Sequence, residues 1–253
     1  GLLAATMQQT DTTVSVRPNA RLELENFSGS ISVRTWDRSQ VRVQASHGRR
    51  DFVEVSASSS VVRIEAEGRN GGPAVEVDYT ITVPVAMSLD LSGTHTDINV
   101  QGVQGEISAE TVDGNVTISG GTGRIDLESV QGQIVLSNAR GRIDVSTVNR
   151  GIHLTDCNGD IVAETVNGPI MLERIQSSSV DAETVNGTIV YDGTLRDGGD
   201  YLMSTHNGGI WLVVPNATNA TVYVSTFNGK LDPSFSVTLK ESSSKRRFSF
   251  VIG

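Results

Sequence analysis

A four-residue turn motif recurs seven times between residues 111 and 229, and it constrains the fold more than any other feature of this sequence. The copies are Thr111–Gly114, Ser129–Gly132, Thr147–Arg150, Thr165–Gly168, Thr184–Gly187, Thr205–Gly208 and Thr226–Gly229. Their first residues are separated by 18, 18, 18, 19, 21 and 21 positions. A short, nearly constant period is typical of stacked coils, in which each repeat covers the core of its neighbour.

Apolar residues alternate with polar ones on both sides of every turn. Around the second turn, Ile125 and Leu127 precede the motif, and Ile134 and Leu136 follow it. Alternation with period two is typical of a strand with one buried face. The sequence therefore predicts an all-β fold, a β-solenoid of the β-helix or β-roll kind, with coils of about 18–21 residues that hold two short strands each.

The same pattern divides the chain into four parts. We expect regular solenoid repeats over 89–232 and a C-terminal strand or cap over 233–253. Residues 13–88 contain alternating strands with looser turns, which predicts wider β coils or a β cap. Residues 1–12 form an apolar segment that is either the remnant of a signal peptide or a strand for exchange between copies.

Each turn combines residue types with distinct roles. We expect the valine row (Val112, Val130, Val148, Val166 and Val185) to point inward, glycine at both corners to have positive φ, and a bulge where Arg150 replaces glycine. The asparagines before the glycines are expected to bond locally or in a ladder along the stack. The turn residues of the later repeats are Asn167, Gly168, Asn186, Gly187, Asn207, Gly208, Asn228 and Gly229.

Composition excludes several classes of function. The net charge of −9 argues against a nucleic-acid partner, because such a partner requires a basic face. No apolar run reaches the 18 residues of a membrane helix, so no membrane span is expected. The single cysteine, Cys157, excludes an intramolecular disulfide, and its place in the turn indicates a small buried side chain.

The opening Phe27–Asp37, the Val83–Pro84 step and the Thr-Val-Asn-Gly turns resemble the bacterial "putative adhesin" β-strand-repeat family. This family is a domain of unknown function in secreted and envelope proteins, and the resemblance covers about residues 13–231. It implies a β-solenoid outside the cytoplasm, secreted or at the bacterial cell surface. It offers no catalytic residues to carry over. The family pattern also implies one more glycine turn after Phe248–Ile252, which this chain lacks.

The central outward position of the second strand in each coil carries no charge, and neither do the residues Asn115, Gln133, Pro169 and Thr188 that flank this row. A neutral row of this kind is the best candidate for a contact surface. The alternative is that the N-terminal region or the 192–200 loop of the same chain covers it. The row consists of Thr117, Val135, His153, Met171, Val190 and Trp211.

Outward positions of the first strand are acidic. Glu110, Glu128, Glu164 and Glu183 form a row that either holds cations or is a solvated face relieved by arginines. Residues 156–160 have an acidic turn character but lack the spacing and final glutamate of a calcium loop. We expect no cofactor, with calcium as the one ion to consider, and the four scattered histidines argue against zinc.

No local motif pairs a nucleophile with a base, so we expect no enzyme. The expected function is a structural or adhesive solenoid outside the cytoplasm. Its partners would be further copies of itself, other surface proteins or glycans. One alternative is a β-helix that binds or processes carbohydrate, and another is an envelope sensor that holds a partner protein.

The two ends of the chain suggest assembly. A solenoid has open β edges, and such edges invite strand addition from another chain. We expect a terminal strand to complete the sheet of a neighbouring copy, giving a head-to-tail fibre. In the alternative, both termini cap their own chain. The assembly residues are Leu2, Leu3, Met7, Phe248, Phe250 and Ile252.

Overall fold

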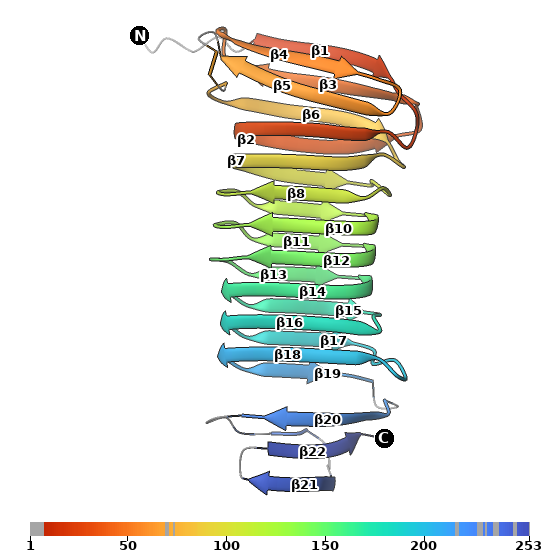
Figure 1. Cartoon of the computed structure of the whole chain (residues 1–253), viewed down its shortest axis with the longest axis vertical. Helices are drawn as coiled ribbons and strands as arrows, with labels where there is room; N and C mark the ends of the chain where they lie inside the picture. Colours follow the sequence, from red (N-terminus) through yellow and green to blue (C-terminus); the bar gives the residue numbers. More distant parts are fainter. Residues whose placement is uncertain are drawn as a thin grey trace.

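The protein is a long stack of β-strands, with no helix among its described residues (Figure 1). In this computed structural model the described residues are 8–68, 71–72, 74–215, 218–226, 230, 232–234, 238–244 and 247–252. Of residues 238–244, 247 and 248 only the backbone is described. The predicted all-β solenoid with two short strands in each coil is confirmed.

The chain alternates between two arrays of parallel strands, which we call the first face and the second face. Strands align from coil to coil, so that Ile125 pairs with Ile107 before it and with Ile143 after it. The first face contains β8 (Ile107–Thr111), β10 (Thr122–Ser129), β12 (Arg140–Thr147), β14 (Asn158–Asn167), β16 (Ser179–Asn186) and β18 (Asp200–Asn207). The second face contains β9 (Val116–Ser119), β11 (Ile134–Ser137), β13 (Ile152–Thr155), β15 (Ile170–Ile175), β17 (Ile189–Gly193) and β19 (Ile210–Val213).

Toward the N-terminus, two long strands pass from the first face to the second without a break. They are β2 (Arg21–Trp36) and β7 (Ser88–Gln101), which pair in parallel along residues 21–33 and 88–100. Beyond β2, β5 (Val61–Gly68) and β4 (Asp51–Ala57) extend the first face. On the second face the added strands are β6 (Val77–Pro84), β3 (Gln40–His47) and β1 (Gln8–Ser15).

At the C-terminal end the regular stack stops at β19, earlier than residue 232. The strand β20 (Ala220–Ser225), which we expected to continue the coils, belongs to a separate antiparallel sheet. There it pairs with β22 (Arg247–Ile252), which also pairs with β21 (Thr238–Ser244). The order β20-β22-β21 places β22 in the middle of this sheet.

The core consists of apolar columns that run along the inside of the stack. Ile125 and Leu127 on the first face, and Ile134 and Leu136 on the second, have 0% of their surface exposed. Full burial of each such side chain contributes about 1.5–3 kcal/mol. Because each coil is too thin to bury these residues alone, neighbouring coils supply the rest of the cover.

At the main corner, where the chain turns from the first face to the second, the expected orientation is reversed. Thr147 is buried, and the next residue, Val148, is 39% exposed. The predicted inward row Val112, Val130, Val148, Val166 and Val185 is therefore wrong, since these side chains are 39–46% exposed. The hydroxyls at this position, which are buried except for the half-buried one of Thr205, donate hydrogen bonds of 2.8–3.0 Å to carbonyl oxygens of the preceding coil. These carbonyl groups need a partner inside the corner.

Glycine is required at the two corners for different reasons. At the second corner, where the chain turns from the second face back to the first, the glycines have positive φ, as predicted. The values are 83° for Gly123, 124° for Gly141 and 130° for Gly159. The described glycines that end the turn motifs (Gly114, Gly132, Gly168, Gly187 and Gly208) do not have positive φ, so for them the prediction is wrong. Instead, a Cβ at Gly132 would collide with the carbonyl oxygen of Gly114 in the preceding coil. Close approach of successive coils excludes a side chain there.

Arg150 replaces a main-corner glycine without forming the expected bulge. On the second face, Ile152 stays in register with Ile134 before it and Ile170 after it. The coil that begins at Thr147 still has 18 residues, so the chain has no extra residue to accommodate. The register shift on this face occurs later, between Glu173 and Ile175.

The predicted ladder of side-chain amides is confirmed at the main corner. Asn149 donates to Gln131 Oε1 at 3.2 Å, and Asn167 donates to Asn149 Oδ1 at 3.2 Å. Asn186 and Asn207 continue the ladder with bonds of 2.8 Å. Each amide therefore joins one coil to the coil before it. Asn228 and Gly229 lie outside the described residues.

Candidate contact surfaces of the stack

The uncharged outward row of the second face forms one continuous line, which we call the neutral stripe. Each member pairs directly with the next across adjacent strands. Val135 is half-buried between its neighbours, and Trp211 at the end of the line is 66% exposed. The neutral stripe consists of Thr117, Val135, His153, Met171, Val190 and Trp211.

Among the residues that the structure describes, neither segment that we considered as a cover lies over the neutral stripe. The N-terminal strands extend the stack lengthwise (Figure 1). The segment 192–200 lies at the second corner, where Leu195 packs against the core and Tyr201 donates to the Ser177 carbonyl at 2.6 Å. Within the described parts of the chain, no strand packs over this surface.

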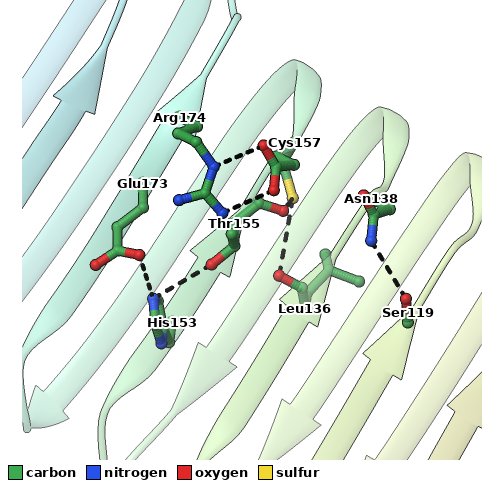
Figure 2. A network of polar contacts seen from close by, with 9 residues as sticks. Ser119, Leu136, Asn138, His153, Thr155, Cys157, Glu173 and Arg174 are labelled. Carbon is green, nitrogen blue, oxygen red and sulfur yellow. Dashed lines mark hydrogen bonds and ion pairs between the residues drawn. The ribbon is translucent and has the colours of Figure 1, made fainter.

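The side chain of His153, a member of the neutral stripe, contacts two polar side chains of the same face. Its Nε2 atom lies 3.2 Å from Glu173 Oε2 and 3.2 Å from Thr155 Oγ1 (Figure 2). Both partners lie on the second face, as His153 itself does. These contacts hold the His153 side chain in position at the surface of the protein.

The acidic turn at residues 156–160 is occupied by an ion pair. Arg174 donates two bonds of 2.8 Å to the two carboxylate oxygens of Asp156 (Figure 2). The bonds from Arg174 hold the pKa of the Asp156 carboxyl below its usual value. Both residues have positive φ, 54° for Asp156 and 52° for Arg174, in the same position of successive coils. Sequence analysis did not predict this pair.

Cys157 is buried in the same turn, as expected. It is 1% exposed, and its Sγ atom lies 3.5 Å from the carbonyl oxygen of Thr155. Burial raises the pKa of the thiol to about 11. A thiol with so high a pKa is protonated at neutral pH and is a poor nucleophile.

The first face carries the predicted acidic row. Glu110 and Glu128 lie directly opposite each other, as do Glu164 and Glu183, and Ser146 interrupts the row between them. Burial, together with nearby Asp126 and Glu110, raises the pKa of Glu128. The part of the chain that the structure describes holds no group of three or more His, Cys, Asp or Glu residues arranged to bind a metal ion.

The predicted C-terminal assembly strand is already paired within its own chain. Because β22 has a partner on each side, it is not a free strand for exchange. Phe250 is 5% exposed in that sheet and Ile252 is half-buried, whereas the side chain of Phe248 is not described. Leu2, Leu3 and Met7 lie outside the described residues.

The core columns end uncovered at the last regular coil. Ile210 and Leu212 occupy inward positions of β19, yet they are 45% and 38% exposed. Their counterparts one coil earlier, Ile189 and Tyr191, are fully buried. This exposed apolar end escaped sequence reasoning, because the pattern predicted a further coil. Among the described residues, no helix has the length and apolar character needed to cross a membrane.

In comparisons with known proteins, the chain is similar in structure to several solved proteins. No family model matches the sequence, and no curated protein matches it. The chain is similar to a putative adhesin from Parabacteroides merdae, with 11% identity and a TM-score of 0.48, over 83% of this chain and 96% of that one. A putative adhesin from Bacteroides fragilis gives 12% identity and a TM-score of 0.46, over 83% and 99% of the two chains. A putative lipid binding protein from Parabacteroides distasonis gives 13% identity and a TM-score of 0.34, over 82% and 95%. The first two names are those of the family that the turn motifs resemble.

Proposed function

We propose that this protein is a non-enzymatic structural or adhesive scaffold of the bacterial cell surface that associates with further copies of itself. The neutral stripe is the observation that carries this proposal. It runs over six coils without a charge, on a chain whose net charge is −9. Removing an uncharged row from water costs less than removing charged side chains, so this surface favours contact.

A second copy is the partner that suits the neutral stripe. Two acidic chains repel each other except where both surfaces lack charge, so their stripes offer the approach with least repulsion. The rows on both copies also share the same spacing, about 4.8 Å per strand. Side chains can therefore interdigitate along the full length of the contact.

The C-terminal end of the regular stack supports contact along the long axis. Ile210 and Leu212 leave an apolar surface there, and the outer edges of β18 and β19 have no strand partner among the described residues. Open edges with exposed apolar side chains promote pairing with another chain. Lateral contact through the neutral stripe and end contact through β18 and β19 would together give a bundle of rods.

Sedimentation velocity over a range of protein concentrations tests the proposal. Val135→Lys places a charge in the neutral stripe, and Val162→Lys places one at a matched half-buried outward position on the first face. We expect wild type and Val162→Lys to associate as concentration rises, and Val135→Lys to remain largely monomeric. A wild-type chain that stays monomeric throughout, or equal association of all three proteins, would contradict the proposal.

A further inference from the structure

A polar groove runs along the outside of the main corner, where the middle of β7 contributes His95 and Asp97. It is a depression open to solvent with a volume of about 420 Å³. Its floor contains Gly114 and Gly132, which stand between two columns of outward side chains. A Cβ at either position would collide with backbone of the preceding coil, so the floor between the flanking side chains is bare backbone.

The walls of the groove carry polar groups in fixed positions. Asp97 Oδ1 accepts a 2.7 Å hydrogen bond from the backbone of Asn115, and Asn115 Oδ1 accepts a 3.0 Å bond from the backbone of Gln133. These bonds hold one oxygen of each side chain, and within the described parts of the chain no hydrogen bond or ion pair engages the other polar atom. Asp113 and Gln131 also line the groove.

Arg150 closes one end of the groove. It is the one residue that replaces glycine in the main-corner column between Gly114 and Gly208. Among the described residues, the side chains of Arg150 and Asp113 form no hydrogen bond or ion pair, and both are exposed. A cationic donor therefore stands about two coils, or roughly 10 Å, from an unpaired carboxylate acceptor.

An aromatic pair marks the opposite end. The rings of Phe27 and His95 meet edge to face, with centroids 5.9 Å apart, and Phe27 is 46% exposed. His95 also lines the groove. An exposed ring beside a polar groove provides a flat apolar surface next to hydrogen-bonding groups.

We propose that this groove binds a neutral oligosaccharide of about three hexose units. Sugar hydroxyls both donate and accept hydrogen bonds, which suits the mixture of carboxylate, amide and guanidinium groups on the walls. The apolar face of a terminal sugar ring would pack on Phe27. Asp97 and Asp113 disfavour acidic sugars by repulsion of like charges. The site is separate from the neutral stripe and does not depend on self-association.

The test is titration of the isotopically labelled full chain with four trisaccharide probes, followed by amide chemical shifts. The probes are maltotriose, cellotriose, mannotriose and triacetylchitotriose, each at millimolar concentration. We expect at least one probe to shift the amides of Gly114, Asn115, Gly132 and Gln133. Asp113→Ala is expected to lower the affinity of the protein for that probe about tenfold, since the substitution removes a charged hydrogen-bond partner.

Two further variants make the result decisive. Asp126→Ala removes a carboxylate from the first face and should leave affinity unchanged, whereas Arg150→Gln should weaken binding as Asp113→Ala does. The proposal is overturned if none of the four probes shifts the groove amides. It is also overturned if Asp113→Ala and Arg150→Gln bind as tightly as Asp126→Ala.

Discussion

The hydroxyl of Thr147 donates a 2.9 Å hydrogen bond to the carbonyl oxygen of Gly132, one coil earlier in the stack. The bond lies inside the main corner, where Thr147 is 4% exposed. Equivalent bonds recur from Thr111 to Thr205. The corner is thus held by buried hydroxyl groups that join successive coils, while the valines beside them face solvent.

Replacement of Thr147 by valine tests this role. The shape of the side chain is kept, but the Gly132 carbonyl loses its buried partner, so we expect the free energy of unfolding to fall by about 1–3 kcal/mol. Thr80→Val is the control, because Thr80 faces solvent on β6 and should change stability by less than about 0.5 kcal/mol. Urea unfolding measures both. Equal stability of the two variants would show that the hydroxyl bonds do not hold the corner.

A second prediction concerns the close approach of coils at Gly132. Gly132→Ala introduces a Cβ that overlaps the Gly114 carbonyl oxygen, so successive coils must move apart, at a cost of about 1–3 kcal/mol or more. At Gly209 the nearest atom to an added Cβ is Trp211 Nε1 at 3.5 Å, an ordinary contact. Gly209→Ala should therefore be tolerated. Thermal unfolding of both variants would reveal an error here if Gly132→Ala proved equally mild.

The raised pKa of Glu128 predicts that replacing this side chain by an uncharged one increases the stability of the protein in a pH-dependent way. Because the folded state disfavours the charged carboxylate, the stabilising protonated form is present below the usual value of 4.5 and is lost as pH rises through the raised pKa. Glu128→Gln should stabilise the protein at pH 7 by less than about 1 kcal/mol, and this gain should vanish below pH 4.5.

Glu25→Gln is the control for this prediction, since Glu25 lies opposite Ser92 and not opposite a carboxylate. Denaturant unfolding at several pH values compares the two variants with wild type. The explanation fails if Glu128→Gln is no more stable than wild type at pH 7, or if Glu25→Gln gains as much.

The sequence predicted the coils well because burial repeats with a strict period. Ile125 and Leu127 had to point inward, since alternation leaves one face for the core and every coil repeats it. The amide ladder through Asn167 followed from the same repeat. The neutral stripe was found in advance because outward positions are set once inward ones are known.

The corners were less predictable, because their chemistry depends on contacts between coils. Val148 has the character of a core residue and Thr147 that of a surface residue, yet the buried carbonyl of Gly132 reverses their places. The pairing of β20 with β22 is likewise absent from the repeat pattern, since it joins segments of unrelated sequence. The groove had one signal in the sequence, the replacement of glycine by Arg150.

Negative-stain electron microscopy of the wild-type chain and of Val135→Lys tests the central claim most directly. The account predicts rods that lie side by side in the wild-type sample, and isolated rods after a charge is placed in the neutral stripe. Val162→Lys should resemble wild type. Isolated wild-type rods at every concentration, or bundles that persist in Val135→Lys, would contradict the claim that this stripe joins copies of the protein.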